Sequence, residues 1–446
     1  MTPAPAPDLR PPPVPLREAF CYWLKLGCIS FGGPAGQIAL MHEELVARRR
    51  WISERRFLHA LNYCMLLPGP EATQLAIYIG WLMHKTRGGI MAGVLFLLPS
   101  LLLLVALSWV YLAFGKVPAV AAVLYGIKPA VVAIVLAAAW RLGARTLRNG
   151  ALAAIAAAAF VAVAVLGVAF PLVVLGAAAS GMLGARLWPE RFALGGAGPG
   201  AAAGYGPALI DDDTPTPEHA RFSGARLALV VGAGAALGLG GWLLAVAAGG
   251  AGGTLAQMGW FFTKAAFLTF GGAYAVLPYV YQGAVEHFQW LSAPQMIDGL
   301  ALGETTPGPL IMVVAFVGFA GAWQHAAPGL GHLAAAGAAG AAVAAWFTFL
   351  PSFVLILAGG PLVESTRDDL RMTAPLTAIS AAVVGVILSL ALFFGRQVFL
   401  PAGQPDWAAL ALGAAACVAL LRFGVGSIKL IAACACAGVV LSYRHG

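Results

Sequence analysis

The sequence predicts an all-α, polytopic membrane protein made of two homologous halves in inverted orientation, with broken or re-entrant helices at two recurring motifs. Three observations support this fold class. The 446-residue chain is 61% hydrophobic and only 10% charged, which is too little charge for the surface of a soluble protein of this length. Its two halves repeat the same motifs in the same order. Equivalent loops of the two halves carry different charge.

Residues 1–16 are rich in proline and lack an apolar core, so we expect a disordered tail and not a signal peptide. The 26 Lys and Arg exceed the 18 Asp and Glu, and in a membrane protein such an excess marks cytoplasmic loops. Nucleic acid is therefore not expected as a partner. The six cysteines lie in or beside apolar runs without metal or disulfide spacing, so neither a metal nor a cofactor is expected.

An internal repeat runs along the chain at a constant offset. The segment "KLGCISFGG" (25–33) matches "KAAFLTFGG" (264–272), and the Pro-Gly-Pro motif at 68–70 matches that at 307–309, both at a shift of 239 residues. Such a gap-free register indicates a duplication.

Farther along, "LLPS" ending at Ser100 matches "FLPS" ending at Ser352 at a shift of 252 residues, because the second half carries an insertion after Trp323. The sequence therefore predicts four parts in order. These are the tail 1–16, a first repeat at 17–190, a cytoplasmic linker with one extra transmembrane helix at 191–255, and a second repeat at 256–446.

Loop charge indicates that the second half is inverted. The loop at 42–56 carries five arginines, whereas its counterpart at 282–295 has no Lys or Arg. Since positively charged loops stay in the cytoplasm, equivalent loops are expected on opposite sides. The extra apolar run at 227–249 is long enough to cross once and so to produce the inversion. Inverted repeats are typical of secondary transporters.

The segment 57–83 is predicted to be re-entrant. The basic loops at 84–89 and 141–149 share the cytoplasmic side with the first basic loop only if this segment enters and leaves on one side. A kinked full span is the alternative. The spans expected to follow lie near 89–114, 118–140, 151–166 and 170–187.

Glycine and proline interrupt apolar helices at the two Phe-Gly-Gly and the two Pro-Gly-Pro motifs. A helix that starts inside the membrane exposes unpaired N–H groups and the positive end of its dipole, which suits a small oxyanion. We therefore expect a central anion site between the two halves. The residues expected at this site are Lys25, Gly32, Gly33, Pro68, Gly69, Pro70, Lys264, Gly271, Gly272, Thr305, Thr306, Pro307, Gly308 and Pro309.

Two pairs of charged residues accompany these motifs. Lys25 and Lys264 occupy the same position in both halves, and a cation inside the membrane is a functional hypothesis by default. The alternative is that each lysine extends from a helix end to the interface. Glu71 and Glu304 flank the Pro-Gly-Pro turns and are candidates to carry a coupling proton, whereas helix capping is the competing interpretation of Glu71.

These motifs resemble those of the chromate ion transporter (CHR) family in its long, two-domain form. The match rests on "SFGGPAGQIALMHEELV", "LLPGPEATQLAIYIGW" and "LLPS" in the first half and on "FLTFGGAYAVLP", "GETTPGPLIMVVAFVGF" and "FLPS" in the second. The resemblance implies a multi-pass protein of the bacterial inner membrane that exports chromate and confers chromate resistance. Chromate and the bilayer are the implied partners; sulfate or another tetrahedral oxyanion is the alternative substrate, and a homodimer is left open.

A membrane-embedded enzyme acting on a lipid phosphate is the competing class. Such an enzyme would need His, Asp or Glu clustered near the interface. Only "MHEE" at 41–44 comes close, and its counterpart in the second half keeps none of it. No catalytic residue is therefore assigned, and a transporter is expected instead of an enzyme.

The charge asymmetry leads to a topology prediction. A reporter fused after residue 200 is expected to report cytoplasm, and one placed near residue 288 is expected to report periplasm, because the loops around them differ in positive charge. Alkaline phosphatase and fluorescent-protein fusions measure the two sides. Both reporters on the same side would contradict the inverted arrangement.

Overall fold

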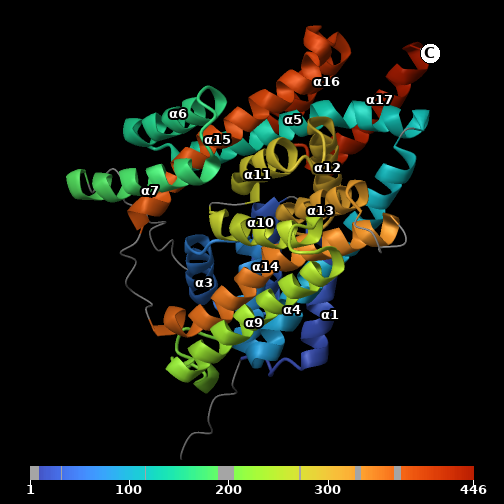
Figure 1. Ribbon diagram of the computed structural model, residues 1–446. Coiled ribbons are helices and arrows are strands. Elements are labelled where there is room, and N and C mark those ends of the chain that lie inside the picture. Colours follow the sequence, from blue (N-terminus) through green and yellow to red (C-terminus); the bar gives the residue numbers. More distant parts are fainter. Residues whose placement is uncertain are drawn as a thin grey trace, which may run out of the picture.

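The computed structural model describes residues 10–31, 33–115, 117–188, 205–270, 273–326, 333–365 and 373–445. Within these residues the chain is built of helices, with one isolated bridge between Ile52 and Ile210 (Figure 1). Six of the described helices are long and apolar enough to cross a membrane. These are the helical stretches Glu71–Phe114, Pro118–Thr146, Phe170–Leu187, Gly224–Gly249, Leu333–Leu362 and Pro375–Phe399. The prediction of an all-α, multi-span membrane protein is confirmed.

The first half begins with short helices and continues with long ones. Its elements are α1 (Leu16–Ile29), α2 (Gly33–His42), the π-helix η1 (Glu43–Arg48), α3 (Glu54–Leu66), α4 (Glu71–Phe114), α5 (Pro118–Thr146), α6 (Gly150–Ala164) and α7 (Phe170–Leu187). Local sequence sets several of these starts. The Ser53 hydroxyl accepts a hydrogen bond from the Arg56 amide at the start of α3, and the Asn149 side chain caps α6 through the Leu152 amide.

The second half follows a short linker helix and one extra helix. The linker holds η2 (Glu218–Ala220), and the extra helix is α9 (Gly224–Gly249). The remaining elements are α10 (Thr254–Leu268), α11 (Ala273–Tyr281), η3 (Gln282–His287), α12 (Ala293–Thr305), η4 (Leu310–Met312), α13 (Val313–Gln324), α14 (Leu333–Ser365), α15 (Thr373–Phe399), η5 (Pro401–Gly403), α16 (Trp407–Leu421) and α17 (Ser427–His445).

The two halves repeat each other in local structure at the shift of 239 residues. The helix α12 begins and ends 239 residues after α3, and η3 does so after η1, which is also a π-helix. After each π-helix one residue adopts a left-handed conformation, Arg50 with φ 51° and Gln289 with φ 53°. Non-glycine residues rarely adopt such a conformation, so the shared deviation shows a common local fold.

The α4 segment is a hairpin of two helical arms. His84 and Lys85 depart from helical geometry, with φ of −131° and 56°. Glycines allow the arms to touch, because a Cβ at Gly80 would lie 2.5 Å from the Gly88 carbonyl oxygen and one at Gly88 would lie 2.2 Å from that of Gly80. The pair α13 and α14 packs likewise in the second half. The chain thus turns twice between α3 and the second arm of α4, at Pro-Gly-Pro and at residues 84–85.

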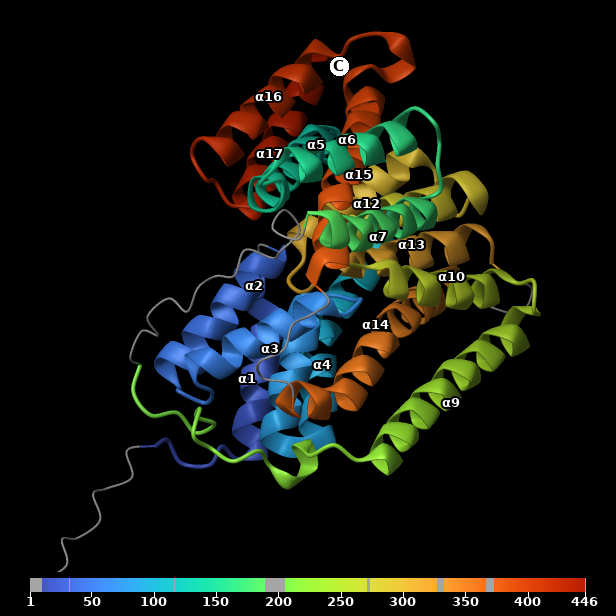
Figure 2. The same ribbon diagram turned by 90° about the vertical axis from the view of Figure 1, so that its left-hand side faces the viewer.

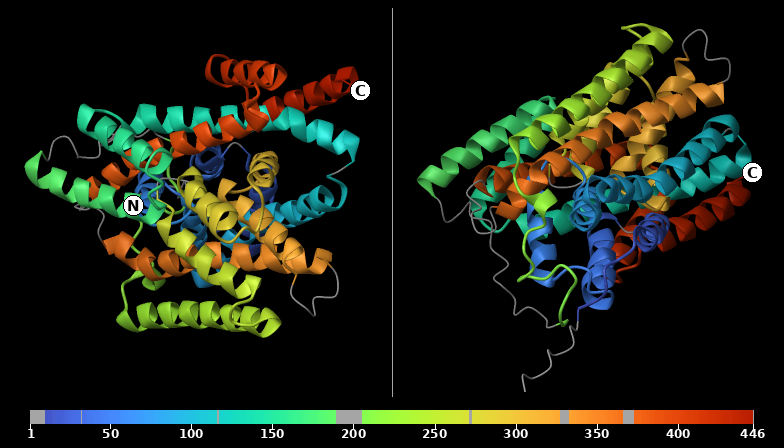
Figure 3. Two further views of the ribbon diagram at one scale, coloured as in Figure 1. Left: turned by 45° about the horizontal axis from the view of Figure 1, so that its top comes forward. Right: turned by 90° about the horizontal axis from the view of Figure 1, so that it is seen from below.

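Helices of the two halves interlock. The helix α15 of the second half packs against α5, α6 and α7 of the first, and α5 in turn packs against α16 and α17 (Figures 1 and 3). The helix α4 of the first half also packs against α14 of the second half. The extra helix α9 lies at the periphery against α10 and α14, and within it only Gly234 and Ala245 are buried (Figure 2). An apolar helix exposed in this way suits contact with lipid.

The described part of the linker binds to the basic loop after η1. The Leu209 amide donates to the Arg50 carbonyl at 2.9 Å, and the Ser53 amide donates to the Ile210 carbonyl at 2.9 Å. The Ser53 hydroxyl also donates to Asp212 at 2.6 Å. The linker and the arginine-rich loop therefore lie on the same side of the protein. Residues 10–15 of the expected tail join them through an ion pair of 2.6 Å between Arg10 and Asp213.

Two buried polar networks connect the halves at related places. In one, the Arg56 guanidinium on α3 lies 3.1 Å from Glu364 on α14, and the Tyr78 hydroxyl donates to the same carboxylate at 2.5 Å. In the other, Asp298 on α12 accepts from the Tyr111 hydroxyl at 2.8 Å. The first network joins α3 to the end of α14, and the second joins the equivalent helix α12 to the end of α4.

The two networks also differ in the charge that the equivalent helices α3 and α12 contribute. The α3 member of the first network is the cation Arg56, whereas the α12 member of the second is the anion Asp298. The cation of the second network is Lys128 on α5, with its Nζ 3.5 Å from Asp298. The two equivalent helices therefore contribute opposite charges, from positions three residues apart in the repeat register.

The first network leads to a stability prediction. Replacing Glu364 with alanine leaves the Arg56 guanidinium buried without this carboxylate, which costs about 3–5 kcal/mol for a buried pair. The melting temperature of the detergent-solubilised protein is expected to fall by several degrees. The matched control is Glu43→Ala, because its pair with Arg48 is exposed on both sides and is worth about 0–1 kcal/mol. Equal melting temperatures for the two variants would contradict a buried, stabilising pair between Arg56 and Glu364.

Candidate functional site

The two halves meet through a reciprocal pair of backbone hydrogen bonds. The Gly69 amide donates to the Thr269 carbonyl at 2.7 Å, and the Gly308 amide donates to the Ser30 carbonyl at 2.7 Å. Both donors and both acceptors are related by the 239-residue shift. Each Pro-Gly-Pro turn therefore contacts the residue that precedes the Phe-Gly-Gly motif of the opposite half. We call Ser30, Gly69, Thr269 and Gly308 the crossing.

The reciprocity has a geometric meaning. When residue i of one unit contacts j of the other and j contacts i in return, a twofold axis relates the two units. The crossing therefore lies on a pseudo-twofold axis between the halves. Ser30 and Thr269 are the residues at which α1 and α10 end, so each accepting carbonyl is one of the C-terminal groups that a helix leaves unpaired.

The two glycines are required by backbone conformation and by space. Gly69 has φ +125° and Gly308 has φ +104°, where side-chain-bearing residues are strained. A Cβ at Gly308 would lie 2.6 Å from the Cβ of Ser100, and one at Gly69 would lie 2.5 Å from the Oγ of Ser352. Ser100 and Ser352 end the "LLPS" and "FLPS" motifs, so each serine packs against the Pro-Gly-Pro turn of the opposite half.

Two glutamine side chains hold the turns. The Gln37 amide nitrogen donates to the Gly308 carbonyl at 2.5 Å, with a longer contact of 3.4 Å to Ser30. The Gln74 amide nitrogen donates to the Pro68 carbonyl at 2.7 Å. Both glutamines are completely buried. These bonds satisfy carbonyl groups that a turn inside an apolar protein would otherwise leave unpaired.

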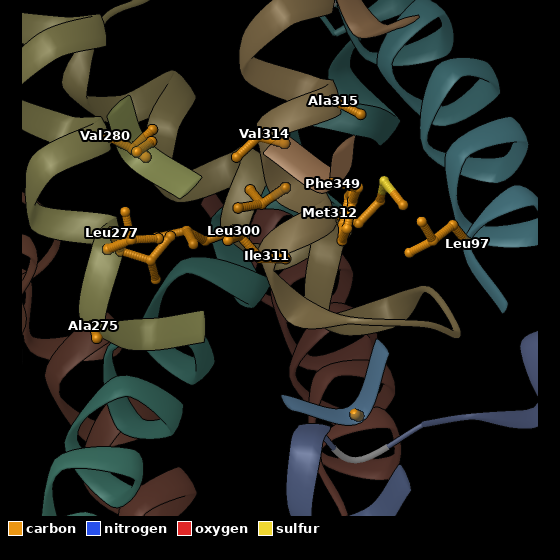
Figure 4. Close-up of a cluster of buried hydrophobic side chains, with 14 of the residues drawn as sticks. Leu97, Ala275, Leu277, Val280, Leu300, Ile311, Met312, Val314, Ala315 and Phe349 are labelled. Carbon is orange, nitrogen blue, oxygen red and sulfur yellow. The ribbon is translucent and has the colours of Figure 1, made fainter. Parts of the chain in front are cut away.

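Several buried hydroxyl groups around the crossing have no hydrogen-bond partner among the described residues. They belong to Ser30, Thr73, Ser100, Thr348 and Ser352, all at most 1% exposed. Buried polar side chains are normally paired, and a concentration of unpaired ones marks strain or a function. The crossing is therefore a polar centre that lies within apolar surroundings. Figure 4 shows a cluster of buried apolar side chains that includes Leu97 of α4 and Phe349 of α14, each three residues before one of the serines in the sequence.

The start of α4 supplies backbone donors next to the crossing. Pro70 is the N-cap, and α4 begins at Glu71. The amides of the first helical turn have no acceptor within the helix and lie at the positive end of its dipole. The amides of Gly69 and Gly308, by contrast, are engaged in the crossing. The candidate donors for an anion are therefore amides of the α4 first turn and not those of the two glycines, and the buried Glu71 carboxyl group lies at the same helix start.

The structure brings together part of the expected site. The residues 68–70 and 307–309 form the two turns, and Gly33 with φ +73° lies beside Leu310 of the opposite half, because a Cβ at Gly33 would be 3.1 Å from its Cδ1. The Thr305 and Thr306 hydroxyls donate to the nearby carbonyls of Leu302 and Gly303. Gly32, Gly271 and Gly272 lie outside the described residues.

The two lysines are not brought to the crossing. Lys25 on α1 and Lys264 on α10 are both exposed, on faces that also expose apolar side chains such as Leu24 and Phe267. The Lys264 Nζ lies 5.7 Å from the centre of the Trp260 ring. This placement suits lysines that extend along the outside of the protein. Their contribution to anion binding stays a prediction.

The two glutamates lie close to the turns in different settings. Glu71 is 9% exposed at the start of α4, and one of its carboxyl oxygens has no hydrogen-bond partner among the described residues. Glu304 accepts a hydrogen bond from the Tyr274 hydroxyl. Their proposed part in coupling stays a prediction as well.

Sequence reasoning missed Ser30 and Thr269 of the crossing itself and the side chains that contact its turns, namely Gln37, Ser100 and Ser352. A signal for the serines was present, because "LLPS" and "FLPS" are repeated motifs in which a small polar residue recurs. The repeat shows that the two serines are equivalent. It does not show that each contacts the opposite half, because that pairing is a property of the packing.

The crossing leads to a prediction about its glycines. Gly69→Ala and Gly308→Ala are expected to lower the melting temperature, because a left-handed conformation costs a non-glycine residue about 1–2 kcal/mol and the new methyl groups would overlap a serine. The matched control is Gly176→Ala, since a Cβ there would meet nothing within 4 Å. Unchanged melting temperatures in both crossing variants would show that the turns are not built as described.

Comparison with known proteins identifies the family. The family model described as "Chromate transporter" matches residues 17–182 and again 256–439. The "Chromate transport protein" of Cupriavidus metallidurans is 30% identical over 390 residues, which cover 86% of this chain and 84% of that protein. The protein of the same name from Pseudomonas aeruginosa is 33% identical over 388 residues, covering 84% of this chain and 80% of that protein.

A "Probable chromate transport protein" of Synechococcus elongatus is 28% identical over 386 residues, covering 86% of both chains. No solved structure matches this chain. The two matched regions lie on either side of the linker and α9, as expected for a protein with two copies of one repeat. The chain belongs to the chromate transporter family, as a long member with both copies of the family domain.

Proposed function

We propose that this protein is a secondary transporter that exports the chromate dianion from the bacterial cytoplasm across the inner membrane and thereby confers chromate resistance. The crossing carries the proposal. It joins equivalent motifs of two repeats in the middle of the chain's apolar core and surrounds them with buried polar groups. Transporters with internal repeats place their substrate sites at the repeat interface, where helices are interrupted. The relatives named for chromate transport support chromate as the substrate.

The anion is proposed to bind beside the turns at 68–70 and 307–309. A doubly charged ion loses its hydration in a buried site, so the site has to replace that hydration with oriented donors. The first-turn amides of α4 provide such donors together with the positive end of the helix dipole. Two related halves in opposite orientation would then expose the same site to either side of the membrane in turn.

The membrane potential suffices as a driving force for export. Moving a charge across the membrane is worth about 2.3 kcal/mol per 100 mV, and a dianion leaving a cell that is negative inside gains twice this amount. Proton exchange through Glu71 and Glu304 is the second means of coupling that the site offers. The two glutamates are not equivalent under the repeat, so a proton carried by them would distinguish the two halves.

Transport in inverted membrane vesicles tests the function. Export from the cell becomes uptake into such vesicles, so saturable accumulation of radiolabelled chromate is expected with the protein present and not in vesicles from the host alone. An ionophore that removes the potential, and another that removes the pH gradient, show which of the two drives uptake. Unlabelled sulfate is the competitor that tests the alternative substrate.

Two outcomes would contradict the proposal. Accumulation equal to that of the host vesicles would exclude chromate transport, provided that the protein is present in the membrane. Accumulation of labelled sulfate that chromate does not inhibit would assign the protein to another tetrahedral oxyanion. Cells that express the protein should also accumulate less chromate and grow at higher chromate concentrations than cells that express the Gly308→Ala variant.

A further inference from the structure

We infer that Ser100 and Ser352 form a pair of ligand hydroxyls that donate hydrogen bonds to one tetrahedral dianion at the crossing. The inference deepens the proposed function and rests on it for the identity of the dianion. It assigns a binding role to two residues outside the motifs at which an anion site was expected. The geometry of the serines, their lack of partners and the uncharged donors beside them carry it in turn.

The serines have related positions across the pseudo-twofold axis. Ser100 on the second arm of α4 lies against Gly308, since a Cβ on that glycine would be 3.0 Å from the serine Oγ. Ser352 on α14 lies against Gly69, where the corresponding distance is 2.5 Å. Each hydroxyl thus reaches the turn of the opposite half. Two donors that approach the crossing from different halves suit a tetrahedral ion, whose oxygens point in different directions.

Ser100 and Ser352 differ from the helical hydroxyls of this protein that are bonded locally, and they share their lack of a partner with Thr73 and Thr348. Ser108, Ser180 and Thr263 donate to the carbonyl four residues earlier, at 2.6, 2.8 and 2.8 Å. This local bond is the usual way for a hydroxyl in a helix to be satisfied. Ser100 and Ser352 are 0% and 1% exposed and have no such bond, nor any other partner among the described residues. Their donors are free, although Ser108 on α4 makes the local bond.

The donors beside the turns limit the ligand class, and the carboxyl groups of Glu71 and Glu304 lie close to the same turns. The amide nitrogens of Gln37 and Gln74 are already engaged with the turns, and Lys25 and Lys264 are exposed elsewhere. The donors beside the turns are therefore neutral hydroxyls and backbone amides. Neutral donors recognise the shape and the oxygens of a dianion, and hydrogen bonds to a charged acceptor are stronger than those between neutral groups. Chromate and sulfate share this chemistry.

Alanine variants test the pair in the full-length protein. Binding of chromate and of sulfate to purified protein is measured by isothermal titration calorimetry, and half-saturating concentrations are measured in inverted vesicles. Ser100→Ala and Ser352→Ala are each expected to raise the dissociation constant on the order of tenfold, as for loss of a hydrogen bond to a charged group. The matched control is Ser108→Ala, because this serine is equally buried on α4 but its hydroxyl is bonded to Leu104.

The melting temperature without ligand separates binding from a structural role. Removing an unpaired buried hydroxyl leaves no partner behind, so Ser100→Ala and Ser352→Ala are expected to melt at or above the wild-type temperature. The control Ser108→Ala leaves the folded protein without a hydrogen bond and is expected to melt at or below it. If an alanine variant does not fold, the cysteine variant at the same position replaces it, since a thiol keeps the volume but is a weak donor.

The outcomes distinguish the inference from the proposed function. Wild-type dissociation constants in both serine variants would overturn the inference and leave chromate transport standing. If the wild type binds sulfate but not chromate and the serine variants weaken sulfate binding, the inference holds and chromate is the wrong substrate. If the folded wild type binds neither dianion, the inference is overturned.

Discussion

The reciprocal hydrogen bonds between Gly69 and Thr269 and between Gly308 and Ser30 are the constraint on which the rest of the fold depends. Backbone groups at a break in an apolar helix have no water to bind, so another part of the protein has to satisfy them. Here each half satisfies the break of the other. The breaks in the two halves are therefore satisfied only together, in a fold in which α4 packs against α14 and α15 packs against α5 to α7.

Around this symmetric centre the side chains are not symmetric. The α3 helix contributes a cation to its buried network, whereas the equivalent helix α12 contributes an anion. The glutamates beside the turns also occupy different positions, one after and one before its motif. A duplicated backbone thus carries different charges on its two related helices.

The proposed site would bind an anion through uncharged donors, without a nearby cation. A cation inside the apolar core would need its own partner, and the described networks show this requirement in Arg56 with Glu364 and in Lys128 with Asp298. Hydroxyls and helix-start amides carry no net charge and need no such partner. They can remain buried while the site is empty at a smaller cost than an unpaired charge. The exposed positions of Lys25 and Lys264 agree with a site that is built from uncharged donors.

The sequence by itself determined the membrane class, the duplication, most spans and the points where helices end, because these follow from local composition and from the conformations of glycine and proline. The expected spans at 118–140 and 170–187, for example, correspond to α5 and α7. Only the tertiary structure decided which motif meets which. That Gly69 contacts Thr269, that Ser100 contacts Gly308, and that Arg56 pairs with Glu364 are relations between residues some 200 or more positions apart. Such pairings, like the outward direction of the two lysines, depend on how whole helices pack, and no local pattern records that packing.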